Sequence, residues 1–195
     1  MGLYKNFVSQ TRKPEGTLGK MMVNGMNGGH AKMADWGIAH LSIDAPSEVL
    51  EIGCGGGRNA GEILKKYPKS YVTAIDYSEV SVAKARDYNK EAIAAKKMEV
   101  NQGDASALDL PEEKYDLATA FETIYFWPGL ERCFGEVARV LKEGGSFMIV
   151  NESDGTDETS LKFEKIIDGM KCYTIDDIKS FHHESKPWIT VIATK

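Results

Sequence analysis

The chain has 195 residues, of which 42% are hydrophobic and 27% charged, and its formal net charge is −5 at pH 7. This composition is typical of one globular domain with a sizeable core, and its acidic balance argues against a nucleic acid as partner. The three cysteines form no CxxC pair, so we expect reduced thiols in a cytoplasmic protein. Because no apolar run approaches the roughly 20 residues that cross a bilayer, we expect no membrane span and no signal peptide.

Residues 1–44 stand apart from the regular pattern that follows them. The segment "GKMMVNGMNGGHAKMADWGIAHL" holds four of the eight methionines and a cluster of glycines. Methionines of this kind either fill an irregular core or present an adaptable surface to a ligand. The sequence therefore leaves two interpretations open, a packed loop and a mobile flap over a pocket.

From residue 47 onward, short apolar runs alternate with amphipathic stretches. The apolar runs predict strands at 48–53, 70–76, 98–104, 115–121, 146–152 and 188–195. The amphipathic stretches predict helices at 58–67, from a Ser78 cap to about 96, within 129–145 with a stop at Gly144 and Gly145, and at about 157–170. Such alternation predicts βαβ units and a mainly parallel sheet, with ligands bound where the carboxyl ends of the strands meet.

The stretch "VLEIGCGGGRN", residues 49–59, places a glycine-rich loop between a predicted strand and a predicted helix. Glycines there permit a tight turn and let a ligand approach the backbone. The dinucleotide fingerprint G-x-G-x-x-G fails, because its sixth position is Arg58. The spacing present is Glu51-x-Gly53-x-Gly55-x-Gly57, which is seen in S-adenosylmethionine sites.

Two aspartates follow later strands. Asp76 ends the second predicted strand, where an acid hydrogen-bonds the hydroxyls of a ribose, and its alternative role is a surface residue in a turn. Asp104 ends the third, where its carboxylate either accepts from an adenine amino group or caps the following turn. Both roles of Asp104 are compatible with each other.

Four motifs, "VLEIGCGGGRN", "AIDYS", "GDASALDLPEEKYDLATA" and "RVLKEGGSFMIV", occur in this order over residues 47–152. Together they resemble the class I S-adenosylmethionine-dependent methyltransferases, in the small-molecule branch that includes the methyltransferase-11 and ubiquinone/menaquinone-methylase-like domains. The resemblance implies an α/β, Rossmann-like three-layer sandwich with a mainly parallel seven-stranded sheet of order 3-2-1-4-5-7-6. Strand seven would be antiparallel, with helices on both faces and a helical N-terminal arm. Residues 171–187 depart from the pattern, since the helix before strand six is one turn long or missing.

The resemblance also implies a set of residues that hold S-adenosylmethionine as cofactor. Glu51, Gly53, Gly55 and Gly57 would form the loop, Asp76 would bind the ribose, Tyr77, Asp104 and Ala105 would contact the adenine, and Phe121 and Glu122 would line the methionine end. We read residues 1–195 as a single domain, with 1–44 as an arm or lid and 45–195 as the cofactor-binding core.

Methyl transfer is an in-line displacement, so the protein mainly supplies alignment, and a base is needed only when the nucleophile keeps its proton. The candidates for this role are His30, Glu122 and Tyr125, with Trp127 as a further substrate contact. Packing alone explains the aromatic residues equally well. We expect the arm to fold over the rim and to bring Met26 and His30 to the methyl group.

His182 and His183 are adjacent, so on a strand they face opposite sides, and we expect no metal site. The predicted function is methyl transfer from S-adenosylmethionine to a small-molecule acceptor by a monomer or homodimer. The alternatives are an NAD-linked oxidoreductase and a non-enzymatic S-adenosylmethionine-binding protein.

Overall fold

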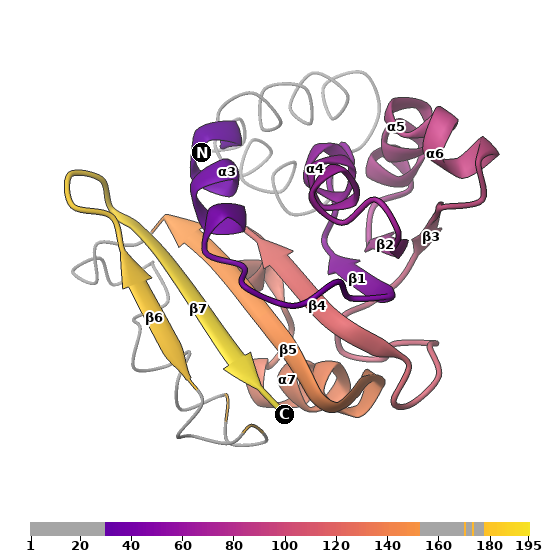
Figure 1. The fold of residues 1–195 in the computed structure, drawn as a ribbon. Coiled ribbons are helices and arrows are strands. Elements are labelled where there is room, and N and C mark those ends of the chain that lie inside the picture. The colour runs from indigo at the N-terminus through magenta and orange to yellow at the C-terminus, as the bar shows by residue number, and fades with distance from the viewer. Residues whose placement is uncertain (1–29, 153–169, 171–172, 174–177) are drawn as a thin grey trace, which may run out of the picture.

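The computed structural model describes residues 30–152, 170, 173 and 178–195. These residues form a seven-stranded sheet of order β3-β2-β1-β4-β5-β7-β6, shown in Figure 1. β7 is antiparallel to both of its neighbours, and the remaining pairs are parallel. In chain order the elements are α3 (Ala31–Ala39), β1 (Glu48–Ile52), α4 (Arg58–Lys66), β2 (Tyr71–Asp76), α5 (Glu79–Tyr88), α6 (Lys90–Ala94), β3 (Met98–Gln102), β4 (Tyr115–Phe121), the 3-10 helix η1 (Ile124–Phe126), α7 (Leu130–Val140), β5 (Leu141–Glu152), β6 (Lys179–His182) and β7 (Trp188–Thr194). The expected sheet order and the antiparallel seventh strand are confirmed.

The core has two layers because successive side chains of each strand face opposite sides of the sheet. Val49 packs in the layer under α3, α4 and α5, whereas its neighbour Leu50 packs in the layer under α7. Met148 and Phe147 of β5 divide in the same way. The strands are therefore buried on both faces, which explains their near-continuous apolar sequences and confirms the three-layer sandwich.

α3 belongs to the predicted N-terminal arm and lies on the same face of the sheet as α4 (Figure 1). Its Gly37 lies against β5 and β7, where an added Cβ would lie 2.5 Å from Cγ2 of Val150 on β5 and 3.1 Å from Oγ1 of Thr190 on β7. Met26 and the rest of the expected lid lie outside the described residues.

Two predicted helices differ from the observed ones. The long helix that begins at the Ser78 cap divides at Asn89 into α5 and α6, because Asn89 leaves the helical conformation and turns its side chain toward the glycine loop. The helix within 129–145 ends at Val140 and not at the glycines. Gly144 is left-handed, with φ +76°, but it lies in an irregular segment of β5 where the register with β4 shifts. The predicted stop at Gly144 and Gly145 is therefore wrong by about one turn.

The carboxyl-terminal strands agree with the expected topology. β7 occupies residues 188–194 and pairs along its whole length with β5. β6 is only four residues long and is the edge strand beyond β7. Strand six is thus present in spite of the short segment before it, and the predicted helix at about 157–170 lies outside the described residues apart from its last position.

Candidate functional site

The glycine loop joins β1 to α4 and is fixed by backbone hydrogen bonds to β2. The amides of Gly53 and Cys54 both donate to the carbonyl of Ile75, at 2.8 and 2.9 Å, and the amide of Gly57 donates to the carbonyl of Cys54 at 2.8 Å. These bonds tie the start of the loop to β2 and close the loop upon itself.

Gly53, Gly55 and Gly57 all have positive φ, but a Cβ on each would meet a different environment. At Gly53 it would lie 2.1 Å from Oγ1 of Thr123, and at Gly57 it would lie 2.6 Å from Nδ2 of Asn89. At Gly55 it would meet nothing within 4 Å. The outer two glycines make room for the protein itself, so Gly55 is the one that leaves space for something else.

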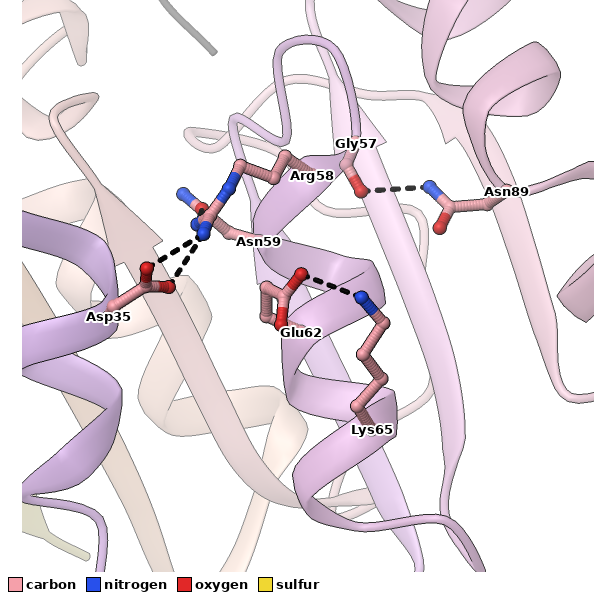
Figure 2. A network of polar contacts seen from close by, with 7 residues as sticks. All are labelled: Asp35, Gly57, Arg58, Asn59, Glu62, Lys65 and Asn89. Atoms are coloured by element: carbon pink, nitrogen blue, oxygen red, sulfur yellow. Dashed lines mark hydrogen bonds and ion pairs between the residues drawn. The ribbon is translucent and has the colours of Figure 1, made fainter. Parts of the chain in front are cut away.

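Asn89 holds the end of the loop from outside the sequence motif. Its Nδ2 donates to the carbonyl of Gly57 at 2.8 Å and to that of Ala85 at 3.1 Å, as Figure 2 shows for the first of these bonds. The side chain that divides the predicted long helix is thus the one that fixes the loop.

Asp76, at the end of β2, faces the same loop. Its Oδ2 accepts from the amide of Gly55 at 2.8 Å, and its Oδ1 accepts from the amide of Ser78 at 2.9 Å. Burial raises the pKa of this carboxyl, and the two amides partly offset that effect. Each carboxylate oxygen has a second lone pair, so Asp76 retains the capacity to accept from ribose hydroxyls.

Glu51 lies on β1 just before the loop and is 1% exposed. Its Oε2 is buried and has no hydrogen-bond partner among the described residues. Burial, with a smaller contribution from Asp76, raises the pKa of the Glu51 carboxyl to about 8. An unpaired buried carboxyl oxygen is costly, and a cationic group of a ligand would satisfy it.

The residues expected around the adenine lie after β2 and β3. The side chain of Tyr77 is 53% exposed, and Ala105 is buried in the layer under α7. Oδ1 of Asp104 accepts from both the amide and the hydroxyl of Ser106 at 2.8 Å, which lowers the pKa of Asp104. The turn-capping role of Asp104 is therefore present, and its adenine contact stays a prediction, as do those of Tyr77 and Ala105.

The three candidate residues for the acceptor side come together beyond β4 and β5. Nδ1 of His30, which precedes α3, lies 3.5 Å from Oε2 of Glu122. The other carboxyl oxygen of Glu122 accepts from the amide of Glu152, and the hydroxyl of Tyr125 donates to the carbonyl of Glu152 at 2.7 Å. Glu152, at the end of β5, thus connects the two candidates that follow β4.

Glu122 has the unusual features of a functional residue. Its φ is +53°, a left-handed conformation that costs a residue with a side chain about 1–2 kcal/mol. Burial raises its pKa to about 7, while the amide of Glu152 lowers this pKa and the charge of the Glu152 carboxylate raises it by a smaller amount. Burial also raises the pKa of Tyr125, with contributions from the same two glutamates. Glu122 is therefore suited to exchange a proton near neutral pH.

Two aromatic candidates pack in the core. Phe121 is buried in the layer under α3 and α4. Trp127 lies 5.8 Å from the ring of Phe134 on α7 and is stacked 6.2 Å from that of Phe147 on β5. Packing explains the position of Trp127, as the alternative interpretation of the sequence allowed.

Four residues near the site were not predicted from the sequence, namely Asp35, Asn89, Thr123 and Glu152. Glu152 is the last residue of the strand predicted at 146–152. Asp76 was selected because it is an acidic residue at the end of a predicted strand, and the same argument would have selected Glu152. The other three residues contact segments that are distant in the sequence, and no motif spacing predicts those contacts.

The described part of the chain contains no group of three His, Cys, Asp or Glu residues placed to hold a metal ion. His183 instead lies against Trp188, with ring centroids 4.8 Å apart. Within the same described residues, no helix has the length and apolar character that a membrane span requires.

Comparisons with known proteins give matches to methyltransferases. A family model described as a methyltransferase domain matches residues 49–145. A phosphatidylethanolamine N-methyltransferase from Cereibacter sphaeroides is 38% identical over 114 residues, which are 58% of this chain and 54% of that protein. A sterol 24-C-methyltransferase from Gibberella zeae is 27% identical over 166 residues, which are 75% of this chain and 43% of that protein.

Among solved structures, the [4+2]-cyclase SpnF superposes with a TM-score of 0.73 at 17% identity, over 84% of this chain and 80% of that one. A likeness at this identity shows the fold and not the reaction. The sequence match and the glycine loop define the class, and the chain belongs to the class I S-adenosylmethionine-dependent methyltransferases. It spans about half the length of the two curated relatives, or less.

Proposed function

We propose that this protein transfers a methyl group from S-adenosylmethionine to a small-molecule acceptor at the carboxyl ends of β1, β2, β4 and β5. One observation carries the proposal. A Cβ on Gly55 would meet only open space and the amide of Gly55 donates to the Asp76 carboxylate, whereas Gly53 and Gly57 of the same loop face other protein atoms. A ligand with ribose hydroxyls and a cationic group fits these neighbours.

On this proposal three sets of residues hold different parts of the cofactor. Asp76 accepts hydrogen bonds from the ribose, while its bonds to Gly55 and Ser78 keep its carboxylate in place. The unpaired Oε2 of Glu51 balances the ammonium of the methionine portion. Asp104, Ala105 and Tyr77 enclose the adenine, and Phe121 borders the methionine end.

S-adenosylmethionine, when bound, supplies a methyl group on a positively charged sulfur. The residues of the chain align the acceptor with it and manage the acceptor's proton. Glu122 accepts that proton at its carboxylate, because its pKa of about 7 suits a base at neutral pH. His30, whose Nδ1 lies 3.5 Å from Oε2 of Glu122, holds the carboxylate in position, and Tyr125 borders the acceptor.

The relatives support a choice of acceptors to test first. The two curated relatives are named for methylating a sterol and phosphatidylethanolamine, so amphiphilic acceptors are the first to test. We also place the protein in a reducing compartment such as the cytoplasm, because the two described cysteines, Cys54 and Cys133, are free and buried. A monomer or homodimer remains the expected assembly.

The proposal is tested by turnover. The full chain is incubated with S-adenosylmethionine and with micelles of a sterol or phosphatidylethanolamine, or with water-soluble amines and phenols, and S-adenosylhomocysteine is measured by mass spectrometry. We expect one acceptor class to produce it above the acceptor-free control. Binding of S-adenosylhomocysteine without turnover on any class would favour a non-enzymatic binding protein.

A further inference from the structure

Arg58 is the residue that breaks the dinucleotide fingerprint, and in the structure it joins two parts of the site. It is the first residue of α4, directly after Gly57. Its Nη2 lies 2.7 Å from Oδ1 and 2.8 Å from Oδ2 of Asp35 on α3, and its Nη1 donates to Oδ1 of Asn59 at 3.1 Å. Figure 2 shows the guanidinium of Arg58 reaching from the end of the glycine loop to Asp35.

The two ends of this ion pair are coupled to different parts of the site. On one side, Arg58 continues from Gly57, whose carbonyl is held by Asn89. On the other side, Asp35 directly follows Ala34, whose amide donates to the carbonyl of His30 in the first turn of α3. A shift of Arg58 therefore reaches His30 through one short, hydrogen-bonded helix.

α3 has one other polar link to α4 within the described residues. Nζ of Lys66, the last residue of α4, donates to the carbonyl of Ile38 at 2.9 Å, near the far end of α3. This link joins the same two helices but lies away from the glycine loop. It gives a matched control for any effect that comes only from loosening α3.

The ion pair is too exposed to be a major source of stability. The side chain of Asp35 is 52% exposed and that of Arg58 is 17% exposed, and pairs of this kind contribute little to folding. The ion pair links the first residue of α4, directly after the loop, to α3, which directly follows His30. This position fits a role in aligning His30 with the loop. His30 lies 3.5 Å from Glu122, a distance that leaves room for a closer approach.

We propose that Asp35 and Arg58 are positioning residues that couple occupancy of the glycine loop to the approach of His30 to Glu122. The inference rests on the proposed function, because it takes the ligand at Gly55 to be the cofactor. Binding at the loop fixes Arg58, Arg58 fixes α3 through Asp35, and α3 sets the position of His30. Because such coupling is reciprocal, His30 and Glu122 in turn bias the loop.

The test uses the full chain labelled at histidine and follows the imidazole signals by NMR as S-adenosylhomocysteine is added. The chain has four histidines, and His30→Gln identifies the signal of interest. In the wild type we expect the His30 ring signals to move on saturation. In Asp35→Asn and Arg58→Gln this movement is lost, while the affinity for S-adenosylhomocysteine stays within about threefold of wild type.

Two further variants separate alignment from simple loosening. The charge swap that combines Asp35→Arg with Arg58→Asp restores the pair, so we expect it to restore the His30 response. Lys66→Met breaks the other link between the helices, and we expect it to keep the response.

Three results would overturn the inference. A His30 response that persists in Asp35→Asn and Arg58→Gln would show that the pair transmits nothing. An equal loss in Lys66→Met would show that any loosening of α3 suffices. A strong loss of affinity in Arg58→Gln but not in Asp35→Asn would assign Arg58 to the ligand itself. Absence of binding to the wild type, measured calorimetrically, would instead reject the proposed function.

Discussion

Glycines that share one backbone conformation have separate roles in this loop. Gly53 and Gly57 are required by Thr123 and Asn89, so substitution there disturbs the fold. A Cβ on Gly55 would meet open space, so we expect substitution there to affect chiefly the binding of a ligand. A motif defined by spacing does not distinguish these cases, but the surrounding atoms do.

The first prediction concerns Gly55. It distinguishes the backbone strain of a substitution at positive φ from the steric effect of a side chain on ligand binding. Gly55→Ala places a methyl group in the open space where we propose that the cofactor binds, so we expect the affinity for S-adenosylhomocysteine to fall by about tenfold or more. Gly144→Ala is the matched control, because Gly144 also has positive φ and open space at its Cβ but lies in β5 away from the loop. Both variants should lose about 1–2 kcal/mol of stability in urea denaturation. Equal affinities in calorimetry would remove Gly55 from the site.

The second prediction concerns the ribose. Asp76→Ala removes the carboxylate that holds the Gly55 amide and is free to accept from ribose hydroxyls on its remaining lone pairs. We expect the binding free energy of S-adenosylhomocysteine to weaken by roughly 1.5–3 kcal/mol, as for a lost hydrogen bond to a charged group. Calorimetric titration measures the change, with circular dichroism to check the fold. A folded variant that binds as tightly as wild type contradicts the assignment.

The third prediction follows from the pKa of Glu51, which burial raises from 4.5 to about 8. Between these values the folded protein keeps a proton that the unfolded chain releases, so the stability contributed by Glu51 falls as the pH rises through this window. Glu51→Gln has no such proton, and its stability relative to wild type should rise by on the order of 3 kcal/mol from pH 5 to pH 8. Urea denaturation without ligand at several pH values measures this. Curves that run parallel for the two proteins would show that Glu51 does not titrate in this range.

At the scale of elements, the break between α5 and α6 coincides with a contact to the glycine loop. A continuous helix over the predicted range would keep Asn89 as an ordinary helical side chain. Instead Asn89 caps α5, and its amide holds the carbonyl of Gly57. The prediction of one continuous helix is therefore wrong at Asn89, the residue whose side chain holds the loop.

The fourth prediction tests that link. Asn89→Ala leaves the buried carbonyl of Gly57 without its side-chain donor, so we expect a loss of about 1–3 kcal/mol in stability and weaker binding of S-adenosylhomocysteine. Asn101→Ala on β3 is the control, because the side chain of Asn101 is exposed. Urea denaturation and calorimetry report the two effects. If Asn89→Ala matches the control in both, Asn89 does not support the loop.

At the scale of the whole molecule, the sheet was predictable because its signals are local. Six of the seven strands were predicted from short apolar runs, and their alternation with helices predicts a mainly parallel sheet. The edge strand β6, with the sequence KSFH, carries no such signal, and the strand order was expected from the family resemblance. The β4 bounds, 115–121, agree with the prediction at both ends. The end of α7 was not predictable from Gly144 and Gly145. Gly144 lies in β5, where the register with β4 shifts, and does not terminate the helix.

The candidate site was predictable where residues follow strand ends and was not where it depends on tertiary contacts. Gly55 and Asp76 were named from spacing, and the structure brings them into contact. Asp35 and Arg58 are 23 positions apart, and no sequence period connects them. The contact between His30 and Glu122 likewise was not predictable, because it depends on how α3 packs on β5 and β7.

The central claim is that the glycine loop binds S-adenosylmethionine and not a dinucleotide. Calorimetric titration of the full chain with S-adenosylhomocysteine and, separately, with NAD tests it most directly. The account predicts saturable binding of S-adenosylhomocysteine at one site per chain, and no binding of NAD at the same concentrations. Saturable binding of NAD together with no binding of S-adenosylhomocysteine would contradict it.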